Sequence, residues 1–222
     1  ALSAAGHQEV DIFTLGGCHL GQESDFIDYR IIPVINTLEQ FGRLKMVAAK
    51  TTSLFPAALH IDTGMTRLGF DSDEMDWLLD RMSEKLVNFD GLDIRYLMSH
   101  LAAGENLSDS TNTIQLSRFR EIRKHFPNTP CSFANSAGIL LGRDYHFQIT
   151  RPGISLYGVH PAGNAIFLEQ NTDANALRPV VSWLARILQI RSAVAGDKVG
   201  YNGTHVITRE SRIATLGVGY AD

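Results

Sequence analysis

The residues that could do chemistry gather around position 151. The stretch ITRPGISLYG (149–158) sets Arg151, Pro152 and Gly153 inside a run that otherwise reads as a strand. A guanidinium on a core strand is unfavourable unless it meets a partner, so Arg151 indicates a binding site more than a structural accident. Since Pro152 and Gly153 interrupt strand pairing, the backbone N–H groups of Gly153 and Ile154 are expected to point freely at an anion.

A second stretch, ANSAG (134–138), would add a hydroxyl group to the same site. Ser136 together with those backbone N–H groups suits a phosphate group. From spacing alone a structural explanation has equal support, in which Ser136 caps a helix and the Pro-Gly pair is a strand irregularity. The charge of Arg151 favours the phosphate site.

Charged and polar residues also follow two earlier strand-like runs. HIDTGMTRLGF (60–70) places His60 and Asp62 at a glycine-bearing loop that carries Arg67, and its small residues would let the backbone approach a ligand. The structural alternatives are a core histidine for His60, a cap for Asp62 and a solvated loop residue for Arg67. His100 lies just past the next strand, where a lone histidine is more often a satisfied polar residue than a base.

Strand-like and helix-like segments alternate along the first part of the chain, and these elements must position the candidate residues. Crossover connections of this length imply parallel strands with helices outside, either as an open doubly wound sheet or as a closed (β/α)8 barrel. In such barrels chemistry lies at the C-terminal ends of strands. The expected strands are 11–16, 31–35, 57–61, 93–98, 130–134 and 148–158.

Two of the intervening helices have clear signals. Asp71 as N-cap and Glu74 three residues later predict a capping box, with Met75 placed to pack on Phe70. Pro127 is expected to end the second helix. The expected apolar faces are Leu78, Leu79, Met82 and Leu86 for the first helix, and Leu116, Phe119, Ile122 and Phe126 for the second.

The pattern changes after about residue 174. There, short runs alternate apolar and polar residues between glycine turns, which predicts an antiparallel β domain. We therefore expect two domains, a partial barrel at 1–174 and the beginning of a β domain at 175–222. If the strands before 136 and 151 are the seventh and eighth of a barrel, its first two strands precede this chain.

Composition excludes several classes of protein. Of 222 residues, 44% are hydrophobic, which is enough for a sizeable core, and 20 basic against 24 acidic residues leave no cationic excess for nucleic acid. Cys18 and Cys131 lie far apart, so neither a disulfide framework nor a metal site is expected, and a reducing cytoplasm fits. No apolar run reaches the ~20 residues that span a bilayer, so no membrane partner is expected.

Six stretches occur in order across nearly the whole chain: HIDTGMTRLGF (60–70), SHLAAGE (99–105), ANSAG (134–138), RPGISLYG (151–158), VGYNGTH (199–205) and GVGYAD (217–222). Together they resemble alanine racemase, a fold-type III enzyme that depends on pyridoxal 5'-phosphate (PLP). The resemblance implies a (β/α)8 barrel followed by a β domain, and a homodimer whose subunits share active sites. It also implies interconversion of L- and D-alanine, which supplies D-alanine for peptidoglycan, although other small amino acids would suit the same residues.

The resemblance assigns roles to the cofactor-binding residues. Ser136, Gly153 and Ile154 would contact the PLP phosphate. Arg151 would face the pyridine nitrogen, with His100 hydrogen-bonded behind it. A charged arginine there keeps the ring nitrogen unprotonated, which weakens the ring as an electron sink and limits side reactions.

The resemblance also assigns the proton transfer and the substrate pocket. Tyr201 matches the tyrosine that exchanges the Cα proton on one face, acting on the partner subunit's site. Cationic neighbours would help it act as a base, for which Arg151 and His100 are the candidates. Tyr220 would line the entrance, or simply pack in the β domain, and Arg67 would help set the substrate pocket.

The family's cofactor-bearing lysine has no match in this sequence. MVAAK (46–50) imitates its context, but Lys50 lies on a helix-like segment and reads as a solvated helix residue. We therefore expect an internal piece of a longer racemase, lacking the lysine segment and most of the C-terminal domain, and inactive alone.

Three other functions stay open at this point. A Schiff-base barrel enzyme acting on a phosphorylated substrate, as in some aldolases, predicts that Lys50 ends a strand. A non-catalytic PLP-binding module predicts no β domain. A decarboxylase of the same fold would favour an acidic partner for the ring nitrogen, which Arg151 argues against.

Overall fold

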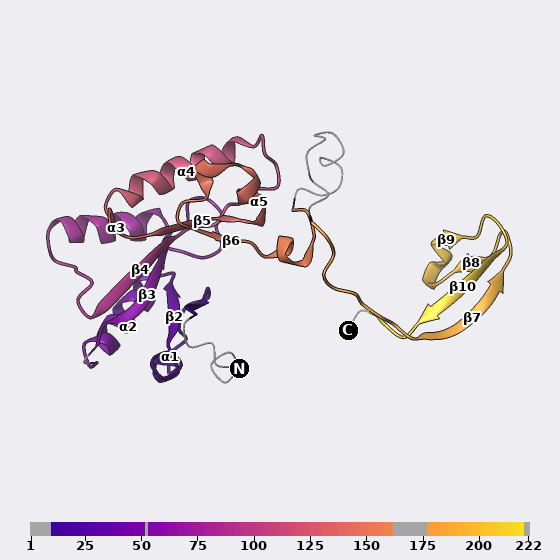
Figure 1. The fold of residues 1–222 in the computed structure, drawn as a ribbon, viewed down its shortest axis with the longest axis horizontal. Coiled ribbons are helices and arrows are strands. Elements are labelled where there is room, and N and C mark those ends of the chain that lie inside the picture. The colour runs from indigo at the N-terminus through magenta and orange to yellow at the C-terminus, as the bar shows by residue number, and fades with distance from the viewer. Residues whose placement is uncertain (1–9, 52, 162–176, 220–222) are drawn as a thin grey trace. The chain divides into compact units, whose positions relative to one another are not determined.

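The computed structural model describes residues 10–51, 53–161 and 177–219. The chain divides into two compact units, Ala1–Arg178 and Pro179–Asp222 (Figure 1). The boundary predicted between residues 174 and 175 lies outside the described residues.

The first unit is built on a six-stranded parallel sheet that curls into part of a barrel. Its strands are β1 (Ile12–Thr14), β2 (Ile31–Ile35), β3 (Phe55–His60), β4 (Leu92–Met98), β5 (Cys131–Asn135) and β6 (Ile149–Arg151). Its α-helices are α1 (Glu23–Asp28), α2 (Leu38–Ala48), α3 (Ser72–Ser83), α4 (Ser110–Arg123) and α5 (Ser136–Leu140), visible in Figure 1. All six predicted strands are present.

The strand order decides between the two folds that the sequence left open. The strands pair in chain order from β1 to β6, each parallel to the one before it. A doubly wound sheet reverses its strand order at a switch point, whereas a (β/α)8 barrel adds each strand beside the last. The sheet therefore confirms a partial barrel.

The last strand is much shorter than predicted. β6 ends at Arg151, and residues Ile154–Tyr157 form a 3-10 helix instead of continuing the strand. Pro152 has no N–H to donate to a neighbouring strand, so pairing stops directly after the arginine. Arg151 thus stands at the carboxyl end of the sheet rather than in the middle of a strand.

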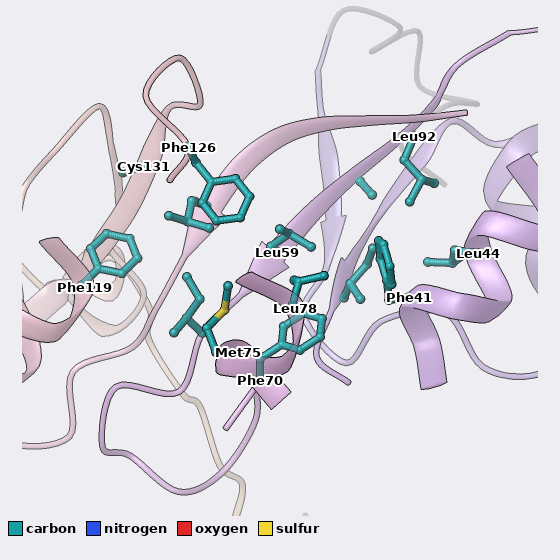
Figure 2. Packing of buried hydrophobic residues seen from close by; sticks show 14 of the residues in the cluster. Phe41, Leu44, Leu59, Phe70, Met75, Leu78, Leu92, Phe119, Phe126 and Cys131 are labelled. Carbon is teal, nitrogen blue, oxygen red and sulfur yellow. The ribbon is translucent and has the colours of Figure 1, made fainter. Parts of the chain in front are cut away.

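The two faces of the sheet carry different residues. One face packs against the helices through a large apolar cluster, which includes Leu59 of β3 together with Leu44, Leu78 and Phe119 of α2, α3 and α4 (Figure 2). The other face carries a small cluster of Val34, Ala58 and Met98, with Phe13 and Tyr96 packed against it. We call this second face the inner face.

The helix starts were predicted better than the helix ends: α4 ends at Arg123, before Phe126 and Pro127. Asp71 accepts from the backbone N–H of Glu74 at 2.8 Å and the Glu74 side chain accepts in return, as predicted for the capping box. Leu86 was wrongly placed on the apolar face: α3 ends at Ser83, Lys85 has a φ of +59°, and Leu86 is 64% exposed.

The second unit contains two antiparallel pairs. Strand β7 (Ile187–Ala193) pairs with β10 (Ser211–Leu216), and the short β8 (Lys198–Val199) pairs with β9 (His205–Val206). A 3-10 turn, η5 (Tyr201–Gly203), lies between β8 and β9. The alternation after residue 174 therefore predicted the right kind of pairing.

Two further expectations concern single residues and the membrane. Cys18 and Cys131 are free thiols buried in the core. Within the described ranges, no helix combines the length and the apolar character that a membrane crossing requires.

Candidate active site

Parallel strands bring polar side chains together at the carboxyl edge of the inner face. Side chains alternate between the faces of a sheet, so a residue two positions past an inner-face residue returns to that face. Asn36, His60 and His100 stand two positions after Val34, Ala58 and Met98 respectively. Ser132 pairs in register with Met98. We call Asn36, His60, His100, Ser132 and Arg151 the polar cluster.

Arg151 is the cation of the polar cluster. Its Nη1 donates to Ser132 Oγ at 2.6 Å, and its Nη2 donates to the Ser99 carbonyl at 2.6 Å and approaches His100 Nδ1 at 3.4 Å. Burial lowers the pKa of Arg151 to about 10, which leaves it charged at neutral pH. No carboxylate in the described part of the chain forms an ion pair with it.

His100 lies between two donors. Its Nδ1 faces Arg151, and its Nε2 is 3.3 Å from the Asn135 side-chain nitrogen, whose oxygen is occupied by the N–H of Gly138 at 2.8 Å. Burial, then Arg151 and then Arg67 lower the pKa of His100 to about 4. The ring is therefore neutral at neutral pH, which corrects the expectation that His100 is a cationic neighbour of the tyrosine.

His60 belongs to the site edge and is not only a core residue. Its Nδ1 lies 2.8 Å from Asn36 Oδ1. Because the Asn36 amide nitrogen donates to the carbonyls of Leu15 and Val34, its oxygen accepts and His60 Nδ1 carries the proton. Burial, followed by Arg151 and His100, lowers the pKa of His60 to about 4, so this ring is neutral too.

Ser136 contacts the turn after β6, but the contact uses a backbone N–H that was expected to be free for an anion. The N–H groups of Gly153 and Ser155 donate to Ser136 Oγ at 2.8 and 3.3 Å, so the Gly153 amide is not free. The amide of Ile154 makes no hydrogen bond to any described residue. Asn135, not Ser136, caps α5. Space is open beside Gly153, where an added Cβ would meet nothing within 4 Å.

Arg67 stands on a tightly closed loop. Asp62 Oδ1 accepts from the N–H groups of Gly64 and Met65, as expected for a cap, and Arg67 itself is exposed. The close approach at Gly69 is made by the chain and not by a ligand: a Cβ there would lie 2.7 Å from Asp62 N. Arg67 contributes charge that lowers the pKa of both site histidines.

The remaining candidates lie on the second unit, beside α2 or outside the described residues. Tyr201 is 90% exposed on η5 of the second unit, and Tyr220 lies outside the described residues. Lys50 is exposed just after α2 and precedes β3, so it does not end a strand. The Schiff-base reading through Lys50 is therefore contradicted.

Three site residues were missed from the sequence. Asn36 and Ser132 were read only as parts of their strands, and Asn135 only as part of ANSAG. A signal existed for Ser132, because it lies two positions before Ala134 on a buried strand and four before Ser136, which directly follows that strand. Asn36 had no local signal, since its role depends on a histidine 24 positions away.

Comparisons with known proteins cover both units. Residues 1–161 match the family model of the alanine racemase N-terminal domain, and residues 180–222 match that of the alanine racemase C-terminal domain. An alanine racemase of Rickettsia bellii is 36% identical over 222 residues, covering 100% of this chain and 52% of that protein. A catabolic alanine racemase of Agrobacterium fabrum is 38% identical over 211 residues, covering 95% of this chain and 51% of that protein.

Solved structures agree with the family models. The structure of Bartonella henselae alanine racemase with covalently bound pyridoxal phosphate matches with a TM-score of 0.80 and 36% identity, covering 100% of this chain and 58% of that one. The biosynthetic alanine racemase of Pseudomonas aeruginosa matches with a TM-score of 0.74 and 29% identity, covering 98% and 58%. The chain thus spans about half the length of the curated relatives it matches.

Proposed function

Because this chain belongs to the alanine racemase family, we propose that the whole protein interconverts L- and D-alanine with PLP as its cofactor. The observation that carries the proposal is the state of Arg151: a partly buried guanidinium at the carboxyl edge of a barrel sheet, held by Ser132, Ser99 and His100, with no described carboxylate beside it. Such a donor fits an acceptor that carries no proton.

The residues present suit the two ends of PLP. The Ile154 amide, which makes no hydrogen bond to a described residue, fits an anionic phosphate, as do the Ser136 hydroxyl and the open space beside Gly153. Arg151 would donate to the pyridine nitrogen, and neutral His100 would hold the guanidinium from behind. Bound PLP supplies an electron sink for the electron pair left when the Cα proton is removed.

Arg151 would tune that sink. Its guanidinium stays charged at neutral pH and cannot accept a proton, so a ring nitrogen held against it would remain unprotonated. A weaker sink suits a racemase, because the substrate carbon regains its proton before other bonds break.

Two bases on opposite faces of the substrate would move the proton. Tyr201 Oη would remove or return it on one face, working in the partner subunit's site of a homodimer. The other base would be a lysine outside these 222 residues. Arg67 and Tyr220 would border the substrate pocket. The high exposure of Tyr201 within its own unit is consistent with a residue that serves another surface.

The proposal includes the cellular location and the physiological role of the enzyme. Free buried thiols suit a cytoplasmic enzyme. Relatives named as catabolic and as biosynthetic alanine racemases both match this chain, and we favour D-alanine supply for peptidoglycan as the role. The strand pairs of the second unit weigh against a single-domain, non-catalytic PLP carrier, which would need no such unit.

The test is racemisation by the intact protein. Loaded with PLP, it should convert L-alanine to D-alanine, followed by chiral chromatography, and Tyr201→Phe should lower kcat at least ~100-fold while PLP absorbance is retained. A protein that binds PLP and forms no D-alanine would rule out the racemase proposal. Full activity in Tyr201→Phe would rule out only the assignment of Tyr201 as a base and not the racemase activity.

A further inference from the structure

Helix α4 buries two amide side chains where a helix usually buries apolar ones. Gln115 is fully buried and Asn112 is 1% exposed, and both lie among the apolar residues Leu116 and Phe119. A buried amide is unfavourable unless its hydrogen bonds are satisfied, so the partners of each indicate what it does.

Gln115 satisfies all of its amide hydrogens and accepts one bond. Its Oε1 accepts from the N–H of Ala102 at 2.9 Å, and its Nε2 donates to the His100 carbonyl at 2.9 Å and to Thr63 Oγ1 at 3.1 Å. These contacts hold the loop after β4 from two sides and join it to the loop after β3. Arg118, one turn later, donates to the Thr63 carbonyl at 3.1 Å and holds the same loop.

Residues 99–102, which Gln115 contacts, also contact Arg151. The Ser99 carbonyl accepts from Arg151 Nη2 at 2.6 Å, and the His100 ring lies 3.4 Å from the same nitrogen. The Ser99 hydroxyl lies 2.8 Å from Thr63 Oγ1, which accepts from Gln115 Nε2, so Thr63 also links Gln115 to Ser99. Displacement of this segment would move two of the three contacts of Arg151.

We infer that Gln115 is a positioning residue for Arg151, acting through the backbone of residues 99–102. It touches neither the proposed cofactor position nor the reacting atoms. Its side chain fixes where the Ser99 carbonyl and the His100 ring stand, and these fix the guanidinium. The expectation that Arg151 faces PLP rests on the proposed function. The inference that Gln115 orients Arg151 does not depend on it.

Asn112 provides a matched control. It lies about one turn before Gln115 on the same helix, is equally buried, and donates to the carbonyls of Ala103 and Asn106 at 3.2 and 2.9 Å. These partners belong to the same loop but carry no contact to Arg151. Loss of Asn112 therefore reproduces the loss of a buried amide without the proposed positioning.

The experiment compares Gln115→Met with Asn112→Leu in the intact protein. Both should lower the unfolding temperature. Only Gln115→Met should weaken PLP binding by the apo protein, on the order of tenfold as for other residues that orient a ligand's direct contacts. Crystal structures should show the Arg151–Ser99 contact lengthened only in Gln115→Met. If Gln115→Met fails to fold, Gln115→Glu keeps the volume and an acceptor and removes at least one of the two amide donors.

Two results would overturn the inference. One is an unchanged Arg151–Ser99 contact in the Gln115 variants, and the other is an equal loss of PLP affinity in Asn112→Leu. Neither readout needs racemisation. If the wild-type protein fails to racemise alanine, the proposed function fails while the crystal structures still decide the role of Gln115.

Discussion

A single fixed positive charge among neutral neighbours is the main feature at the residue scale. Arg151 and two histidines lie near one another, and three cations there would repel strongly. The low pKa values of His60 and His100 leave Arg151 as the only charged member of the polar cluster at neutral pH. Its partners are neutral oxygens and a ring nitrogen, so its charge is not cancelled.

His60 should make stability depend on pH. Its pKa is lowered from 6.5 to about 4 in the folded chain, so between these values the unfolded state binds a proton that the native state does not. The contribution of neutral His60 to the free energy of unfolding is fully present above pH 6.5 and is lost as pH falls toward 4. Between pH 7.5 and 4.5 this loss is about 2 kcal/mol after allowance for solvent screening.

Urea unfolding of the intact protein at the two pH values measures this effect. His60→Gln keeps a donor for Asn36 but cannot titrate, so its free energy of unfolding should fall less than that of the wild type by about that amount. An equal fall in both proteins would mean that His60 is already charged or solvated in the native state.

Residue types singled out part of the candidate site. Arg151 was singled out because a guanidinium on a core strand is unfavourable without a partner, and Ser136 because it follows a strand of the predicted barrel; their roles stay predictions. Asn36, Ser132 and Gln115 were not found, since their roles come from pairing across strands and loops far apart in sequence. The neutral state of His100 could not be predicted either, because it depends on burial beside Arg151.

At the scale of elements, the loop after β3 is tightly closed by backbone contacts. Its ends are joined by Asp62 N–H to the Phe70 carbonyl at 2.9 Å and by Phe70 N–H to the His60 carbonyl at 2.8 Å. Gly69 has a φ of +108° and its missing Cβ leaves room for the backbone of residues 60–62. This closure fixes the path of the loop that carries Arg67.

Gly69→Ala should therefore be strongly destabilising. The new Cβ would meet backbone atoms at 2.7, 2.9 and 3.0 Å in a conformation that L-residues avoid, which should lower the free energy of unfolding by about 2–4 kcal/mol. Thermal or urea unfolding of the intact protein measures it.

Gly42→Ala is the control for this change. Gly42 lies on the exposed side of α2, and an added Cβ there meets nothing within 4 Å. Alanine favours helix more than glycine does, so this variant should gain about 0.5–1 kcal/mol. Equal behaviour of the two variants would show that the loop relaxes around position 69.

Local sequence signals located most elements but not all of their ends. The capping box at Asp71 and Glu74 was predicted because its spacing is fixed by helix geometry. The ends of α3 and β6 were not, because a left-handed residue at Lys85 and the proline after Arg151 stop them before their apolar patterns end.

At the scale of the whole molecule, strand order carries the fold assignment. The spacing of strands and helices was compatible with two architectures, and only the observed pairing in chain order selects the barrel. The six stretches that resemble alanine racemase favoured the same architecture. They come from both units, so they indicate the order of the two domains as well as the barrel.

Product analysis of Arg151→Glu in the intact, PLP-loaded protein tests most directly whether the charge of Arg151 controls the reaction. From L-alanine the wild type should form D-alanine with little pyruvate. The variant should lose racemisation on the order of 100-fold and form a larger share of pyruvate, since an acidic group strengthens the electron sink. The exposed Arg120→Glu should behave as wild type. Wild-type racemisation by Arg151→Glu, with no added pyruvate, would contradict the account.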